Sequence, residues 1–336
     1  MCGIAGFVGS RPIVPRTVAR MRAALRRRGP DAEHVALFDA MRNRTEGAAT
    51  LGLVHTRLSI IDPRPEADQP MANESGDVWI VYNGEVYDWA DTAATLAAAG
   101  YAFRTRSDTE LILHAYEHWG IDCVGQLRGM FAFGIVDFRR GRLFLARDRL
   151  GLKPLVYAAR PDGLGFASTV RGLLPWLSAR GLWFPLGGTS NHFRMDALRA
   201  AGGWDAHNVT EDADIAVRLA RRGGRLATLA SATAEEAPLD FSAWRAQRRR
   251  WMKGWMQTWI VHMRRPARLW RELGPAPVTA LALPAGSYVL ELTLVDHAPT
   301  RYPVLLARGE AFTADVPLVT SARVPADMVY VPPGRV

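Results

Sequence analysis

The chain has 336 residues, and its 42 Lys and Arg exceed its 33 Asp and Glu by nine. Hydrophobic residues make up 49% of it, which excludes a disordered tail or a fibre and leaves room for two or three domains with their own cores. The arginines stand in short clusters such as Arg248 to Arg250. Solvated faces explain such clusters more often than nucleic acid does, so we predict no nucleic-acid partner.

Cysteine content and hydropathy restrict the class of protein further. Cys2 and Cys123 are the two cysteines of the sequence, too few for a disulfide framework and without the spacing of a metal-ligand pair. The start lacks the basic and apolar regions of a signal peptide, and no run approaches the roughly 20 apolar residues that cross a bilayer. We predict a cytoplasmic chain with no metal and no cofactor.

The first 174 residues show a mixed pattern of helices and strands. Val18, Met21 and Leu25 recur at helical spacing before the stop signal at Gly29 and Pro30. Further on, three apolar runs predict strands, the last two of them paired as a hairpin: Val78 to Tyr82, Phe131 to Asp137, and Leu143 to Arg147.

A second helix is predicted to start after Ser107 and to end at Gly120. The Ser107 hydroxyl can cap it, and Glu110 three residues later completes the sequence pattern of a capping box. Its predicted buried stripe consists of Ile112, Tyr116 and Trp119.

Composition changes twice in the second half, near residues 173–185 and again at residues 274–277. The middle stretch reads as helical and rich in arginine, whereas Tyr288 to Leu294 and Tyr302 to Leu306 alternate like strands. We therefore predict domains at residues 1–174, 184–273 and 278–336.

Five segments of the first domain carry polar residue types in a specific order after Cys2. They are Arg28-Gly29-Pro30-Asp31, His55 to Asp62, Tyr82-Asn83-Gly84-Glu85-Val86-Tyr87, Ser107-Asp108-Thr109-Glu110, and Ala146 to Leu155. In this order and spacing they resemble the class II glutamine amidotransferases, specifically the N-terminal domain of glutamine-dependent asparagine synthetases. The resemblance covers about half of the chain and implies an N-terminal-nucleophile αββα sandwich within an α+β chain.

The resemblance also implies a reaction, the hydrolysis of L-glutamine to glutamate and ammonia. Cys2 would be the nucleophile, and its α-amine, freed by removal of Met1, would be the base, since such amines have an ordinary pKa of about 7.7 to 8.0. The side-chain amide of Asn83 and the backbone N–H of Gly84 would bind the oxyanion.

Free glutamine would be recognised through both of its charged ends. The resemblance assigns the α-carboxylate to Arg57, whose planar fork suits a bidentate contact, and the α-ammonium to Glu85 and Asp108. Arg57 has a plain alternative as a salt-bridge partner, Glu85 as a turn residue, and Asp108 as an acid facing the helix dipole. Backbone groups expected beside Arg57 are those of Leu58, Ile60 and Ile61.

The synthetase half of that family is not visible in this sequence. Its Ser-Gly-Gly-x-Asp-Ser pyrophosphate-binding loop does not occur, and the resemblance ends near Leu174. We therefore expect ammonia to be released, and leave open a separate synthetase that accepts it.

The middle segment contains Thr210-Glu211-Asp212 and, later, Gln247-Arg248-Arg249-Arg250-Trp251. As a set they resemble the second half of family 2 processive glycosyltransferases of the cellulose synthase type. The resemblance implies that Asp212 is a general base and that Gln247, Arg250 and Trp251 bind an acceptor glycan and a nucleotide pyrophosphate. Because the metal-binding and nucleotide-binding first half of that family has no counterpart here, we predict no glycosyl transfer.

The same segment has structural interpretations. Thr210 can cap a helix that stops at Gly223-Gly224. The tryptophans 244, 251, 255 and 259 share one helical stripe, which is either core or a face that contacts a membrane surface through residues 243–270.

The C-terminal segment resembles small PEGA-like β modules, and Met328 to Gly334 is similar to the entry of formylglycine-generating-enzyme-like domains. Three incomplete resemblances in series are typical of a fusion, natural or artificial. The leading hypothesis is a glutaminase. The rivals are a non-catalytic scaffold with an idle amidotransferase fold and a membrane-associated glycosyltransferase fragment.

Overall fold

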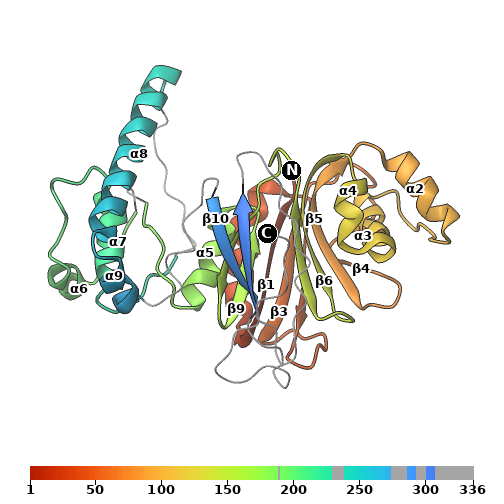
Figure 1. Cartoon of the computed structure of the whole chain (residues 1–336), viewed down its shortest axis with the longest axis horizontal. Helices are drawn as coiled ribbons and strands as arrows, with labels where there is room; N and C mark the ends of the chain where they lie inside the picture. Colours follow the sequence, from red (N-terminus) through yellow and green to blue (C-terminus); the bar gives the residue numbers. More distant parts are fainter. Residues whose placement is uncertain (188–189, 229–237, 274–285, 293–299, 307–336) are drawn as a thin grey trace. The chain divides into compact units, whose positions relative to one another are not determined.

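The computed structural model describes residues 1–187, 190–228, 238–273, 286–292 and 300–306. They fall into two compact units, one with residues 1–176 and the two C-terminal strands, the other with residues 177–273. The first unit contains two layered β-sheets and the second is helical (Figure 1).

The strands within residues 1–176 are β1 (Gly3–Ile13), β2 (Ala32–Phe38), β3 (Ala49–Arg57), β4 (Met71–Ala72), β5 (Val78–Val86), β6 (Gly129–Asp137), β7 (Arg142–Arg147), β8 (Val156–Arg160) and β9 (Gly163–Ala167). The accompanying helices are α1 (Pro15–Leu25), α2 (Trp89–Ala98), α3 (Asp108–Trp119), α4 (Cys123–Gln126) and α5 (Val170–Ala179).

Two antiparallel sheets face each other. One has five strands in the order β2-β3-β1-β9-β8, and the other has four in the order β4-β5-β6-β7. Side chains alternate along a strand, so every second residue enters the space between the sheets. That interior is filled from both sheets by residues that include Ile4, Leu53, Val81, Ala132 and Phe166.

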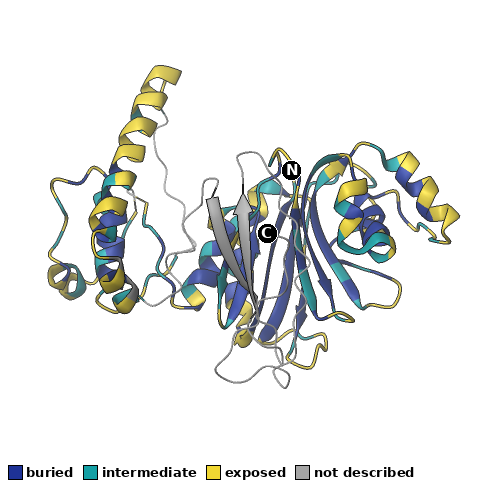
Figure 2. Cartoon of the chain, in the orientation of Figure 1, coloured by how far each residue is buried: buried dark blue, intermediate teal, exposed yellow. Residues whose placement is uncertain are grey.

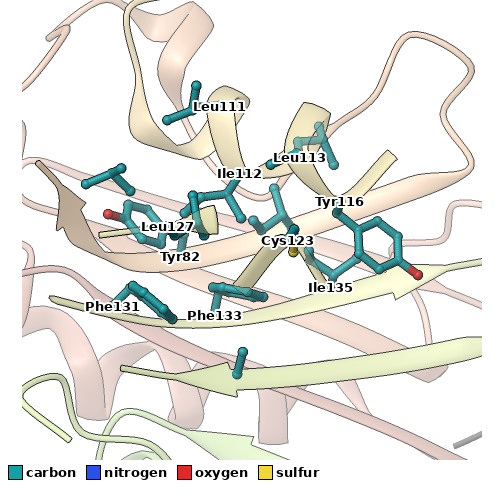
Figure 3. Packing of buried hydrophobic residues seen from close by; sticks show 14 of the residues in the cluster. Tyr82, Leu111, Ile112, Leu113, Tyr116, Cys123, Leu127, Phe131, Phe133 and Ile135 are labelled. Carbon is teal, nitrogen blue, oxygen red and sulfur yellow. The ribbon is translucent and has the colours of Figure 1, made fainter. Parts of the chain in front are cut away.

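The outer faces of both sheets are covered by helices. On the four-stranded sheet, Tyr116 of α3 and Cys123 of α4 pack against Phe133 and Ile135 of β6 (Figure 3). On the five-stranded sheet lie two more helices, α1 with buried Val18, Met21 and Leu25, and α5 with Trp176. Trp176 packs on Gly165, where a Cβ atom would lie 2.5 Å from the indole. The layers are α, β, β and α, and the expected N-terminal-nucleophile sandwich is confirmed.

Most of the local predictions are confirmed, but Trp119 of the predicted buried stripe is only partly buried, and Thr210 precedes α7 (Glu211–Ala220) without a side-chain cap bond. The helix that buries Val18, Met21 and Leu25 forms, as does the β6–β7 hairpin. Ser107 caps α3 by accepting from the Thr109 N–H at 3.1 Å. The capping box is wrong, because the Glu110 carboxylate turns away and accepts the N–H groups of Arg104 and Thr105.

The second unit comprises α6 (Met195–Ala200), α7 (Glu211–Ala220), α8 (Phe241–Met263) and α9 (Pro266–Leu273). Residues at the start of α7 and just before it hold α8: Asn208 donates to Thr258 at 2.8 Å, and His262 lies 2.7 Å from Asp214. Most of α8 is exposed (Figure 2). Among the described residues, no helix has the length and hydropathy to cross a membrane.

In the C-terminal part, β10 (Gly286–Leu292) pairs antiparallel with β11 (Thr300–Leu306), which confirms two strands there. The rest of the PEGA-like segment, including Met328 to Gly334, lies outside the described residues.

Candidate active site

One end of the sandwich brings the predicted catalytic residues together. β1 pairs Gly3 with Thr56, so the next pair outward is Cys2 and Arg57. Ile4 and Leu53 face the interior, and alternation turns Cys2 and Arg57 to the same side. From the opposite sheet, Asn83 follows the interior residue Val81 by two positions. Both sheets therefore direct polar side chains to this end.

The Cys2 thiol lies against the backbone that follows β3. Its Sγ is 3.4 Å from the N–H nitrogen of Leu58 and 3.7 Å from the Leu58 carbonyl oxygen. Arg28 Nε donates to the Cys2 carbonyl at 3.0 Å, which ties the start of the chain to the turn after α1. Gly29 permits that turn, since a Cβ there would lie 2.2 Å from the Thr56 carbonyl oxygen.

The side-chain amide of Asn83 and the backbone N–H of Gly84 are two hydrogen-bond donors at this end of the sandwich. Asn83 is 1% exposed, and its Nδ2 has no hydrogen-bond partner in the described chain. A buried donor of this kind costs about 1–3 kcal/mol when it stays unpaired. Gly84 has no room for a side chain, because a Cβ would lie 2.3 Å from the Met130 carbonyl oxygen. Such an amide can donate to a ligand oxygen.

Asp108 is a buried carboxylate at the first turn of α3. Its Oδ2 accepts the Val86 N–H at 2.8 Å and the Tyr82 hydroxyl at 3.3 Å. Burial raises the pKa of Asp108, although these two hydrogen bonds lower it, and the charge of Glu85 raises it further. Burial also raises the pKa of Tyr82, with contributions from Asp108, Cys2 and Glu85, so these groups share one electrostatic environment.

Arg57 is held within the chain. Its Nη1 donates to the Arg64 carbonyl at 3.0 Å and to Asp68 Oδ1 at 2.5 Å, and its Nη2 donates to the Asp62 carbonyl. The salt-bridge interpretation therefore holds for this structure, and the guanidinium closes the loop after β3. In that loop the side chains of Ile60 and Ile61 are 76% and 40% exposed.

Three residues in this arrangement received no role from the sequence. Arg28 and Tyr82 stand inside two of the quoted segments, so their place in those segments was the available signal. Asp68 gave none, since its contact with Arg57 depends on how the intervening loop folds back.

The glycosyltransferase-like residues are not joined in the same way. Burial raises the pKa of Asp212, and Glu211 adds to it. Trp251 is 39% exposed with the Arg248 guanidinium 4.4 Å above its ring. In the described residues no hydrogen bond links Asp212 to Gln247, Arg250 or Trp251. Since Trp244, Trp251 and Trp259 are 39% to 52% exposed, the stripe is not core.

One group of described side chains has ligand atoms spaced for a cation, namely Glu74, His114 and Glu117. Arg104 lies 3.8 Å from Glu74 and Arg139 lies 3.4 Å from Glu117, so the acids already have cationic partners. We assign no metal to this group.

The two facing sheets and the helices on their outer faces define an N-terminal-nucleophile fold. The chain belongs to the glutamine amidotransferase domain family, whose model matches residues 1–181. A second model, glycosyl transferase family group 2, matches residues 167–307 and so covers less than half of the chain.

Relatives of known name match the same half. Asparagine synthetase 3 of Bacillus subtilis, a glutamine-hydrolyzing type, is 38% identical over 192 residues, covering 54% of this chain and 29% of its own length. A putative asparagine synthetase 2 of Methanocaldococcus jannaschii is 33% identical over 189 residues, covering 52% and 35%. The chain thus spans about a third of these relatives. The solved glutamine phosphoribosylpyrophosphate amidotransferase of B. subtilis covers 51% of this chain and 43% of its own, with 20% identity and a TM-score of 0.45.

Proposed function

We propose that this chain hydrolyses L-glutamine to glutamate and ammonia, with Cys2 as the nucleophile after Met1 is removed. The thiolate attacks the side-chain amide carbon, ammonia leaves, and water then releases glutamate from the thioester. The free α-amine of Cys2 takes the thiol proton and returns it to the leaving nitrogen.

The observation that carries this proposal is the unpartnered Asn83 amide at the same end of the sandwich as Cys2. A folded protein rarely leaves a buried donor unpaired, and an oxyanion formed beside the thiol would satisfy it. The Gly84 N–H is the second donor of the proposal.

Substrate recognition in the proposal uses charges on both sheets. Asp108 and Glu85 receive the α-ammonium, and Arg57 receives the α-carboxylate by sharing the fork that Asp68 now holds. The backbone of Leu58, Ile60 and Ile61 lines that side. The ammonia acceptor is a separate synthetase or none.

Covalent labelling with a glutamine-analogue electrophile tests the proposal. Peptide mapping should place the adduct on Cys2 and none on Cys123, which is fully buried and whose pKa burial raises to about 12. Excess glutamine should protect Cys2. Intact mass must show loss of Met1. A retained Met1 with no adduct would leave the non-catalytic scaffold as the better account.

A second candidate function, contact with an anionic membrane surface, is favoured by α8. Its 23 residues include five Arg or Lys and no acid, and it exposes apolar side chains. Basic residues together with exposed tryptophans are also found on helices at lipid interfaces, although in α8 they do not form two opposite faces. Those apolar side chains, at 39% to 72% exposed, are Phe241, Trp244, Trp251, Met252, Met256, Trp259, Ile260 and Val261.

Vesicle co-sedimentation separates this candidate from a solvated helix. Binding should occur with vesicles containing phosphatidylserine, should be weak with phosphatidylcholine alone, and should fall on Trp251→Ala combined with Trp259→Ala. Equal recovery in the supernatant with both vesicle types would exclude it. Incorporation of sugar from a nucleotide donor, lost on Asp212→Asn, would support glycosyl transfer instead.

A further inference from the structure

A second concave site lies in the first unit, formed by the ends of its strands remote from Cys2. Its volume is about 320 Å³. The last residue of β2, the segment just before β5 and the turn after β6 build it. Its lining residues are Phe38, Arg42, Arg44, Gly76, Asp77, Trp79, Phe138 and Arg139.

The floor of this site is aromatic. Phe38 packs edge-on against Trp79 and Phe138 with ring centroids 5.3 and 4.9 Å apart. Trp79 Nε1 donates to the Gly76 carbonyl at 2.8 Å, which fixes the indole. The floor is therefore a packed surface and does not need a ligand to order it.

Two guanidinium groups stand over this floor. Arg44 lies 5.3 Å from the Phe38 centroid and 5.0 Å from that of Trp79, and Arg42 lies 5.9 Å from that of Phe138. A β-bridge between Phe38 and Arg44 holds the backbone of Arg44. Asp39 holds the backbone around Arg42, since its Oδ1 accepts the N–H groups of Met41 and Asn43.

Positive charge in this site is only partly compensated. Arg139 faces Glu117 and Asp137, but the described structure gives Arg42 and Arg44 no carboxylate partner, and Arg42 Nη1 donates to the Phe138 carbonyl at 2.8 Å. The lining itself has three arginines and one acid, Asp77, which is a formal net charge of +2 before the two acids that face Arg139 are counted. A phosphate monoester carries about −1.5 to −2 at pH 7, and guanidinium forks match its oxygens.

We propose that this site binds a small phosphate-bearing ligand through Arg42 and Arg44. Its location is separate from the glutaminase end, so the proposal does not depend on glutamine hydrolysis. β5 connects the two ends: Trp79 lines the phosphate site, and Asn83 lies four residues further, about 13 Å at strand spacing.

Hydrogen exchange and calorimetry on the full chain, with inorganic phosphate as the probe, test the proposal. Phosphate should bind saturably and slow exchange in peptides covering residues 38–45 and 76–80. Arg42→Gln with Arg44→Gln should weaken binding at least tenfold. The matched control, Arg248→Gln with Arg249→Gln, removes the same charge from α8 and should change affinity less than twofold.

A variant that is expected to bind phosphate more tightly separates loss of the site from misfolding. Asp77→Asn removes the one acid in the lining and should tighten phosphate binding roughly two- to fivefold. Binding that survives the Arg42/Arg44 variant, binding lost equally in the α8 control, or unchanged affinity in Asp77→Asn would each overturn the assignment.

Discussion

The two units of this chain use sequence motifs differently. In the first, Cys2 directly precedes β1, Asn83 lies on β5 of the other sheet, and Asp108 in the first turn of α3 accepts the N–H of Val86 at the end of β5. In the second, Asp212 lies on α7 and Gln247, Arg250 and Trp251 lie near the exposed start of α8. The hydrogen bonds that join those helices are made instead by Asn208, Thr210, Asp214, Thr258 and His262.

This difference teaches that the order of motif residues along the chain and the contacts among them are separate properties. A two-sheet interior fixes which face each residue takes, because a one-residue change of register would reverse every side chain. Two packed helices contact each other along one face each, so residues on their other faces are not positioned by this contact. The first unit should therefore lose activity sharply on substitution of motif residues, and the second should tolerate it.

The largest expected effect is at Cys2. Cys2→Ala should lower glutamine turnover by a factor on the order of 10⁴ or more, because no other described group replaces the nucleophile. Ammonia release measured at saturating glutamine gives the rate. Cys123→Ala is the matched control and should keep turnover, although it opens a small gap in the core beneath α4. Equal loss in both variants would point to folding and away from nucleophilic catalysis.

Asn83→Ala should lower kcat by about 10²- to 10³-fold with little change in KM, since an oxyanion donor acts in the transition state. Asn73 offers the comparison. It is also buried, but it bonds Glu117 and the Val78 N–H and does not point to the Cys2 end. Asn73→Ala should lower thermal stability and leave kcat unchanged. If Asn83→Ala raised KM alone, the oxyanion role would be excluded.

Arg57→Gln should raise the KM for glutamine roughly 10- to 100-fold with a smaller change in kcat. The carboxylate of free glutamine then has no cationic fork. The competing interpretation is that Arg57 only holds the loop through Asp68. Asp68→Asn distinguishes them: it frees the fork, so the KM should stay or fall if Arg57 binds substrate, and rise as in Arg57→Gln if loop closure is what matters.

Much of the first unit was predictable because its signals are local. The helix over Val18, Met21 and Leu25 follows from spacing, and the β6–β7 hairpin from two alternating runs. The capping box failed because a tertiary alternative was stronger: the Glu110 carboxylate receives three donors from Arg104 and Thr105. Sequence spacing cannot weigh that competition.

The site residues that sequence reasoning missed depend on contacts between distant segments. Arg28 meets the Cys2 carbonyl across 26 positions, and Asp68 meets Arg57 through a loop whose course no periodicity describes. The exposed Trp stripe of α8 had the opposite difficulty, since helical spacing defines a face but not what covers it.

The buried His114 gives a pH test of the first unit. Burial lowers its pKa, but Glu110 and Glu117 raise it overall to about 9. Because the folded value exceeds the ordinary 6.5, the stabilisation is complete below pH 6.5 and is lost as pH rises through about 9. The free energy of unfolding should fall by on the order of 3 kcal/mol across that window. Urea unfolding of His114→Gln should lack this decline, and a decline of equal size would assign it elsewhere.

The smallest expected effect is at Asp212, and it tests the second half of the comparison. Burial, and after it Glu211, raise the pKa of this carboxyl, so the folded chain stabilises its charged form less than the unfolded chain does. Asp212→Asn removes that cost and should leave thermal stability equal or slightly higher, with glutamine turnover within twofold of wild type. Glu211→Gln is the matched control, removing the neighbouring charge on α7. A large loss of turnover in Asp212→Asn alone would mean that this carboxylate contributes to glutamine hydrolysis.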